Sequence, residues 1–442
     1  MKSTFARLSF LFCVLFLALP SLHAKDQILI IGDSLSKEYK VEFAASQAIN
    51  WIEILDDVRN DYFDMGSFSV YPLDTRGTGH EYNWAIPGAT SADFVDLLTG
   101  GSFFQDRVQD EIKDQLRKEV DRAIVFLGGN DLEPIYGRIY RGDDPEPLIA
   151  RIERNIIEVV DWVISKSRSR NPDLEICLVT APHIGATPKI KREHPPHEVK
   201  TQQVTDAIIE LNRRLKAAAD ERDIAFADVY TLTEDLLDSS RYCYAGFEFL
   251  NRSADDGTEE EYLWLGGFLS ADFHPNTIGQ ALVANDIIDA FNEHYDARIQ
   301  RLGGTEILSR ILGRNADFDF DRWIQCYNLQ ESAPDEDPDR DGLTNLAEFA
   351  LDMEPARSDA ALLPLSVRQL EEIPGRIEFR YRVRRRDTAE VTIIPQRSID
   401  LIDWTDLDPA EAVVKDGAYV FEEETPEKGE VFFRLQITPG ES

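Results

Sequence analysis

Three short segments, far apart in the sequence, carry side chains that could together transfer an acyl group. They are Gly32-Asp33-Ser34-Leu35, Gly128-Gly129-Asn130-Asp131 and Asp272-Phe273-His274-Pro275. A serine hydroxyl is a weak nucleophile until a base removes its proton, and an imidazole can take up and return a proton near neutral pH. An amide N–H can stabilise the oxyanion that forms on the attacked carbonyl. The three segments therefore supply a candidate nucleophile, a candidate base and a candidate oxyanion donor.

Each of these residues has an expected role. Ser34 is the candidate nucleophile and His274 the candidate base, while Asp272 is the nearest carboxylate that could orient the imidazole and stabilise its charged form. The candidate oxyanion donors are the backbone N–H groups of Ser34 and Gly88 and the side-chain amide of Asn130. Because Ser34 directly follows an apolar strand, we expect it to open a helix whose N-terminus adds positive potential.

Strands and helices alternate along the part of the chain that carries these residues. Apolar runs predict buried strands at 27–31, 123–127, 176–179 and 224–229. Helical periodicity predicts helices over 105–120, 147–168, 198–221 and 277–296. This alternation indicates a central parallel sheet covered on both faces, which binds ligands beyond the carboxyl ends of its strands. Ser34 and Asn130 both follow such strand ends.

Four segments in this order resemble the SGNH (GDSL) hydrolase family, and the resemblance covers roughly residues 26–298. Gly32-Asp33-Ser34 is similar to the family's nucleophile segment, and Gly88 to the glycine donor of its second block. Gly128-Gly129-Asn130-Asp131 is similar to its Gly-x-Asn-Asp block, and His274-Pro275 to its last block. The resemblance implies a three-layer α/β/α fold that hydrolyses carboxylic esters and needs no cofactor for catalysis.

The carboxylate beside His274 departs from the family pattern. The family usually has two residues between the acid and the histidine, whereas only Phe273 separates Asp272 from His274, and Ala271 occupies the usual acid position. Two explanations remain open. Either the turn is one residue shorter and Asp272 still reaches the ring, or a backbone carbonyl orients His274.

A second cluster of polar residues has the spacing of a calcium-binding loop. Residues 337–348 align with the twelve positions of an EF-hand loop. The ligand positions one, three, five, seven, nine and twelve are occupied, in this order, by Asp337, Asp339, Asp341, Leu343, Asn345 and Glu348. Leu343 would contribute only its backbone carbonyl, and Gly342 occupies the sharp turn at position six. The segment resembles calcium loops that join domains in secreted bacterial proteins, which implies a structural Ca²⁺ remote from Ser34. The competing interpretation is a solvated acidic linker.

The chain divides into four segments by composition and pattern. Residues 1–24 combine a basic start, a short apolar run and a small residue, as in a signal peptide, so we expect a secreted or periplasmic protein. Residues 25–298 form the predicted hydrolase domain, and 299–355 a helical connector with the calcium loop. Residues 356–442 alternate apolar and polar side chains, which indicates a small accessory β-sandwich-like domain. No stretch after the signal peptide is apolar enough to span a bilayer.

The formal net charge of −35 argues against nucleic acid or an anionic membrane as a partner. The expected partner is a small ester, an acylated glycan or a lipid, and the sequence does not indicate an oligomeric state. No apolar lid segment is evident, which favours short acyl groups, and secretion with an accessory domain favours deacetylation of a glycan. A bridge between Cys243 and Cys326 could form after export.

Three other functions fit parts of the sequence. One is a lipase or acylhydrolase acting on lipids. Another is a non-catalytic carbohydrate-binding or adhesion protein on a hydrolase fold, which would explain the short spacing between Asp272 and His274. The last is a metal-dependent hydrolase that uses the acidic loop.

Overall fold

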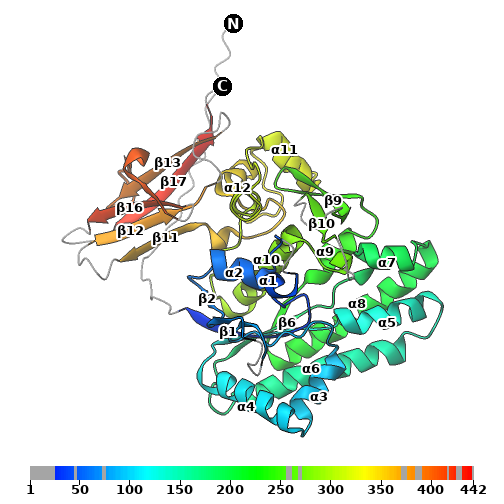
Figure 1. Ribbon diagram of the computed structural model, residues 1–442. Helices are drawn as coiled ribbons and strands as arrows, with labels where there is room; N and C mark the ends of the chain where they lie inside the picture. The colour runs from blue at the N-terminus through cyan, green and yellow to red at the C-terminus, as the bar shows by residue number, and fades with distance from the viewer. Residues whose placement is uncertain are drawn as a thin grey trace. The chain divides into compact units, whose positions relative to one another are not determined.

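The computed structural model shows two compact units (Figure 1). The larger unit comprises residues 25–242 and 248–302, and the C-terminal unit comprises 243–247 and 303–442. The predicted signal peptide lies outside the described residues. No helix within the described part of the chain is long and apolar enough to cross a bilayer. The structure describes residues 25–43, 47–71, 76–254, 261–266, 271–369, 376–383, 391–415, 418–424 and 431–440.

A five-stranded parallel sheet forms the centre of the larger unit, in the order β2-β1-β5-β6-β7. Its strands are β2 (Phe63–Asp64), β1 (Asp26–Gly32), β5 (Arg122–Phe126), β6 (Glu175–Val179) and β7 (Ala225–Ala227). The strands are apolar in consecutive positions because helices cover both faces of the sheet. The predicted parallel sheet is therefore confirmed.

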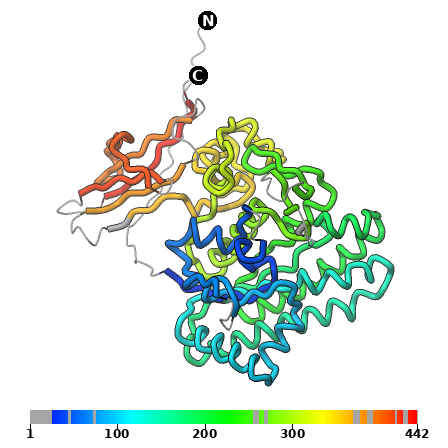
Figure 2. The backbone as a smooth tube through the Cα atoms, viewed as in Figure 1, coloured from blue at the N-terminus to red at the C-terminus, as the bar shows by residue number. Residues whose placement is uncertain are grey.

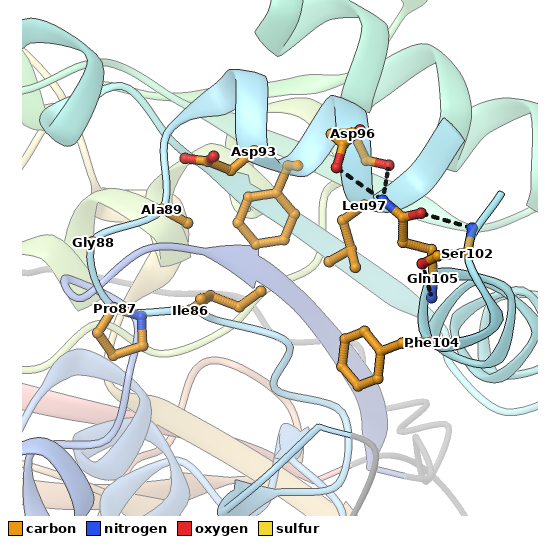
Figure 3. Close-up of a pocket in the computed structure, with 11 residues that line it drawn as sticks. Ile86, Pro87, Gly88, Ala89, Asp93, Asp96, Leu97, Ser102, Phe104 and Gln105 are labelled. Carbon is orange, nitrogen blue, oxygen red and sulfur yellow. Dashed lines mark hydrogen bonds between the residues drawn. The ribbon is translucent and has the colours of Figure 1, made fainter. Parts of the chain in front are cut away.

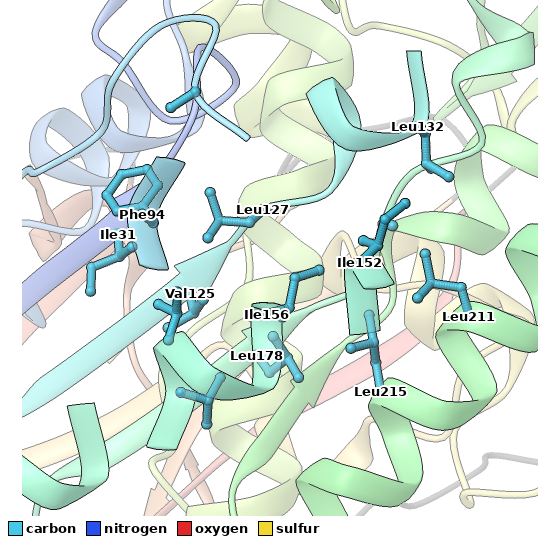
Figure 4. Packing of buried hydrophobic residues seen from close by; sticks show 14 of the residues in the cluster. Ile31, Phe94, Val125, Leu127, Leu132, Ile152, Ile156, Leu178, Leu211 and Leu215 are labelled. Carbon is cyan, nitrogen blue, oxygen red and sulfur yellow. The ribbon is translucent and has the colours of Figure 1, made fainter. Parts of the chain in front are cut away.

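One face of the sheet is covered by helices from the middle of the unit's sequence. They are α3 (Ser91–Thr99), α4 (Phe103–Lys118), α6 (Glu146–Ser167) and α8 (Glu198–Arg222). Leu29 and Ile31 of β1 point to this face and belong to one buried cluster with residues of these helices. Figure 4 shows Ile31, Val125 and Leu178 of three strands packed with Ile152 and other side chains of the cluster. The apolar side chains that repeat with helical spacing in the sequence thus form the buried core between these helices and the sheet.

The other face is covered by helices α2 (Trp51–Val58) and α10 (Thr277–Tyr295). They lie side by side although they come from opposite ends of the unit's sequence (Figure 2). Helix α10 also packs on β6 and β7. The segment that carries His274 directly precedes α10, so this layer brings the end of the unit's sequence back to β1.

Two antiparallel sheets form the C-terminal part of the second unit. One has the order β11-β12-β16-β15 and the other β14-β13-β17. Phe379 of the first sheet stacks on Phe433 of the second, with ring centroids 4.7 Å apart, so the two sheets face each other as in a β-sandwich. Cys243 and Cys326 form a disulfide within this unit. The strands are β11 (Leu365–Gln369), β12 (Arg376–Tyr381), β13 (Val391–Ser398), β14 (Thr405–Asp406), β15 (Val413–Lys415), β16 (Ala418–Glu424) and β17 (Phe432–Pro439).

Candidate active site

Ser34 lies in a turn directly after β1, at the carboxyl edge of the sheet. The carboxylate of Asp33 accepts the backbone N–H of Leu35 (Oδ1–N 2.9 Å), and the N–H of Ser36 donates to the carbonyl of Asp33 at 3.1 Å. Hydrogen bonds of this kind stabilise a turn in competition with a helix. The prediction that Ser34 opens a helix is therefore wrong, since the next helix, α1 (Tyr39–Glu42), begins later and has only four residues.

His274 meets Ser34 from the other end of the larger unit's sequence. Its Nε2 lies 2.8 Å from Ser34 Oγ, and both side chains are buried. The carbonyl of His274 accepts the N–H of Leu265 at 3.0 Å, which anchors the segment next to strand β10 (Tyr262–Trp264). The ring of Phe43 packs edge-on against the imidazole at a centroid distance of 5.0 Å. The imidazole is thus fixed within hydrogen-bonding reach of the hydroxyl, as a general base must be.

Asn130 connects the turn of Ser34 with the loop of Gly88. It lies in the first turn of helix α5 (Gly129–Tyr140), and its backbone N–H hydrogen-bonds the carboxylate of Asp33. Its side-chain Nδ2 donates to the carbonyl of Ala89 at 3.1 Å. Because a side-chain amide carries two N–H groups, this bond uses only one donor and leaves the second for an oxyanion.

The loop of Gly88 is held against strand β1. The N–H of Trp84 donates to the carbonyl of Ile30 at 2.8 Å, and the N–H of Ile86 donates to the carbonyl of Gly32 at 2.9 Å. Gly88 has a φ of +78°, a backbone conformation that glycine adopts without strain. The hydrogen bond between Ile86 and Gly32 fixes the loop two residues before Gly88 and two residues before Ser34. The backbone N–H of Gly88 therefore belongs to a loop that is held close to the turn of Ser34.

Two buried carboxylates fasten these loops together. Asp131 accepts the hydroxyl of Ser91 at 2.6 Å and its backbone N–H at 2.8 Å. Burial, opposed by hydrogen bonds from the backbone of Leu35 and Asn130, raises the pKa of Asp33 to about 7. Both side chains are engaged with backbone N–H groups of the surrounding loops, which gives them a positioning role.

A further buried network fixes the chain that follows Ser34, and sequence reasoning did not assign it to the site. The carboxylate of Glu38 accepts the backbone N–H of His80 at 2.8 Å and lies 3.0 Å from its ring Nδ1, while Nε2 lies 3.4 Å from Asp56. Although burial opposes the shift, hydrogen bonds from His80 and the charge of Lys37 lower the pKa of Glu38 to about 2. The residues are distant in sequence and follow no motif, so only the fold reveals the network.

Asp272, the predicted orienting acid, forms an ion pair with Arg192. Its Oδ2 accepts a hydrogen bond from Arg192 Nη1 at 2.6 Å, and among the described residues this guanidinium is its hydrogen-bonding partner. The bond raises the pKa of Arg192 further above its usual range. Orientation of His274 by Asp272 therefore stays a prediction.

An open groove of about 470 Å³ begins at the loop of Gly88 and runs along the start of α4. The side chains of Ile86, Leu97 and Phe104 point toward a common space in it (Figure 3). Three of its polar side chains, those of Asp96, Ser102 and Gln105, hydrogen-bond to groups of the wall itself. Gln105 Nε2 donates to Asp96 Oδ2 at 2.8 Å, and Gln105 Oε1 accepts the N–H of Ser102 at 2.9 Å. The surface left for a ligand is mainly apolar.

The acidic loop of the C-terminal unit is folded around its own carboxylates. Gly342 has a φ of +99° and its N–H donates to Asp337 Oδ2 at 3.1 Å. The N–H of Asp341 donates to Asp339 Oδ1 at 3.2 Å. Thr344, which departs from the aliphatic residue usual at its position, caps helix α12 (Asn345–Leu351) through its hydroxyl. The loop therefore has the compact turn and the exiting helix of a cation-binding loop.

Several buried oxygens of this loop have no hydrogen-bond donor among the residues that the structure describes. The side chain of Glu348 is fully buried, and neither of its carboxylate oxygens has such a donor. Asp337 Oδ1, Asp339 Oδ2 and Asn345 Oδ1 share this property. Burial and the charges of nearby aspartates raise the pKa of Glu348 to about 10. Because buried acceptors are nearly always satisfied, these oxygens fit a hard cation such as Ca²⁺.

Comparison with known proteins places the larger unit in a family. The sequence profile of the GDSL-like lipase/acylhydrolase family matches residues 30–282, which is more than half of the chain. No curated protein matches the sequence.

Similar solved structures include three hydrolases of low sequence identity. The lipase Lip_vut3 from a goat rumen metagenome is 13% identical, with 60% of this chain and 97% of that chain covered and a TM-score of 0.38. An extracellular lipase from Streptomyces rimosus is 15% identical (60% and 100% covered, TM-score 0.35). A carbohydrate esterase family 3 protein from Talaromyces cellulolyticus is 14% identical (61% and 99% covered, TM-score 0.30). The family assignment rests on the match of residues 30–282 to the sequence profile. The chain therefore belongs to the GDSL-like lipase/acylhydrolase family and is a carboxylic ester hydrolase.

Proposed function

We propose that the protein is a secreted serine esterase that works through an acyl-enzyme on Ser34. The observation that carries this proposal is the buried contact of 2.8 Å between Ser34 Oγ and His274 Nε2. His274 takes the hydroxyl proton as Oγ attacks the ester carbonyl, and then gives it to the departing alcohol. Water, deprotonated by the same imidazole, then attacks the acyl-enzyme; the bond between the acyl carbon and Ser34 Oγ breaks, the imidazolium returns the proton to Oγ, and the acid is released. The N–H groups of Ser34, Gly88 and Asn130 stabilise the oxyanion in both steps.

Turnover of p-nitrophenyl acetate by the full chain, with and without a chelator, tests this function. We expect turnover in both conditions as long as the protein stays folded, because the proposed steps use only side-chain and backbone groups. A folded protein that hydrolyses no ester in a broad panel would refute the proposal. Immediate loss of turnover on chelation of a protein that remains folded would favour a metal-dependent hydrolase.

Asp272 remains the proposed orienting acid for His274, and its exchange for asparagine tests that role. Asp272→Asn keeps the shape of the side chain and removes its charge, so we expect kcat to fall by up to about 10⁴-fold. Arg192→Ala is the matched control, since it removes only the partner in the 2.6 Å ion pair. Steady-state kinetics of both variants decide the question. Equal, small losses in both would assign the orienting role to a backbone carbonyl.

The groove beside Gly88 supports a substrate whose acyl group is longer than acetyl. Ile86, Leu97 and Phe104 offer apolar contacts that start at an oxyanion donor, so an acyl chain could extend from the reacting carbonyl along them. Phe104 is 59% exposed and becomes more buried when a chain covers it. Each buried methylene contributes about 0.8 kcal/mol, which corresponds to about a fourfold gain in kcat/KM.

A chain-length series of p-nitrophenyl esters measures this preference. We expect kcat/KM to rise from acetate to hexanoate, and Leu97→Trp, which fills the groove, to abolish the rise while leaving acetate turnover nearly unchanged. Ile209→Trp, at a half-exposed site on α8, is the control. Deacetylation of a glycan, the preference indicated by the sequence, would instead give release of acetate from an acetylated polysaccharide and no gain from longer chains.

We also propose export and a structural calcium ion. The Cys243–Cys326 disulfide supports an oxidising compartment, in keeping with the predicted signal peptide. The calcium ligands would be the side chains of Asp337, Asp339, Asp341, Asn345 and Glu348, with the carbonyl of Leu343. The buried oxygens that lack donors among the described residues support this set.

A further inference from the structure

A carboxylate from outside the twelve-residue loop joins the acidic cluster. Oxygens of Asp341, Glu348 and Asp359 all lie within 4.8 Å of one another, as do those of Asp337, Asp339 and Asp341. Asp341 is common to both groups, so five carboxylates surround one small region. Asp359 lies beyond helix α12 and eleven residues after the last position of the loop.

The backbone holds Asp359 in this position independently of its side chain. Asp341 Oδ2 accepts the N–H of Asp359 at 2.9 Å and the N–H of Ala360 at 2.7 Å. Asp341 Oδ1 accepts the N–H of Leu343 at 2.8 Å. The carboxylate at loop position five therefore ties the distant segment to the loop, and the side chain of Asp359, 4% exposed, is enclosed with Glu348.

The buried end of the cluster is where a positive charge is most needed. Glu348 is fully buried, and its two oxygens have no donor among the described residues, while the oxygens of Asp341 and Asp359 approach it. Converging carboxylates repel one another, and burying the Glu348 carboxylate without a donor or a positive charge is costly. A hard cation would be bound by all three groups at once.

We propose that Asp359 is a ligand of the cation bound by loop 337–348, in addition to the ligands that the loop itself supplies. Together with the loop's side chains and one carbonyl, it would complete the six to eight oxygens that Ca²⁺ takes. A site made almost entirely of protein oxygens suits Ca²⁺ better than Mg²⁺, which keeps several waters. The ion would then fasten the loop to the segment that leads into the short helix η5 (Ala360–Leu362) and strand β11.

Calcium titration of the chelator-stripped full chain by calorimetry tests the proposal. Asp359→Asn is expected to weaken Ca²⁺ binding by about tenfold or more, because it removes a charged ligand and keeps the side-chain shape. Asp335→Asn, a nearby exposed aspartate outside the cluster, makes the same change in charge and is expected to bind Ca²⁺ as the wild type does. Circular dichroism shows whether each variant remains folded.

Hydrogen exchange of the unmodified protein gives a second readout that needs no variant. Ca²⁺ is expected to slow exchange at the amides of Asp359 and Ala360 together with those of the loop. Wild-type affinity in Asp359→Asn, or slowed exchange confined to the loop, would exclude Asp359 as a ligand and leave the loop site standing. A wild-type protein that binds no Ca²⁺ would overturn both this inference and the calcium site on which it rests, with no effect on the proposed esterase.

Discussion

Replacing Ser34 by alanine is expected to lower kcat by about 10⁴- to 10⁶-fold, with the fold unchanged. The physical reason is that the acyl-enzyme path needs an oxygen nucleophile 2.8 Å from the imidazole of His274, and alanine leaves only the oxyanion donors and substrate binding. The measurement is steady-state hydrolysis of a p-nitrophenyl ester, with thermal unfolding to verify stability.

Ser36→Ala is a matched control for this substitution. Ser36 lies two residues further along the same turn, and its buried hydroxyl has no hydrogen-bond partner among the described residues. The control is expected to retain wild-type kcat. Equal rates in Ser34→Ala and in the wild type would instead show that the observed ester hydrolysis does not depend on Ser34, as expected for a binding protein on a hydrolase fold.

Asn130→Ala is expected to lower kcat by about 10²- to 10³-fold and to change KM little. The side-chain amide would donate to the oxygen that becomes negatively charged, so its effect is larger in the transition state than in the bound ester. The same amide also donates to the carbonyl of Ala89, so part of the loss could come from the loop of Gly88.

A second asparagine provides a control for the loss of a structural side-chain amide. Asn171 donates through its Nδ2 to the carbonyls of Leu116 and Val120, distant in sequence from the catalytic turns. Asn171→Ala is expected to lower the melting temperature and leave kcat unchanged. A normal kcat in Asn130→Ala would remove this residue from the oxyanion site.

The regular elements of the larger unit could be predicted from periodicity. The helix predicted over 198–221 is Glu198–Arg222, and the strand predicted at 27–31 is β1. The helix is long and the strand is buried over its last five residues, so their apolar pattern decides their structure. Two-residue strands such as β2 and β14 were not predicted, because they are defined by a partner strand and have no pattern of their own.

The site was predictable where local sequence carries the information. Gly-Asp-Ser and His-Pro are short motifs that can be recognised from adjacent residues alone. The structure confirms that the fold brings Ser34 and His274 together. The turn after β1 was misjudged because the side chain of Asp33 competes with the helix for backbone N–H groups. Arg192 and Asp359 lie outside any motif, and only tertiary structure brings Arg192 to Asp272 and Asp359 to the acidic loop.

Capture of the covalent intermediate tests the central claim most directly. A serine-reactive fluorophosphonate, followed by peptide mass spectrometry, is expected to label one residue of the folded protein, Ser34, and to leave Ser34→Ala unlabelled. His274→Ala is expected to label much more slowly, because the hydroxyl loses its base. Labelling of another residue, or undiminished labelling of Ser34→Ala, would contradict an acyl-enzyme on Ser34.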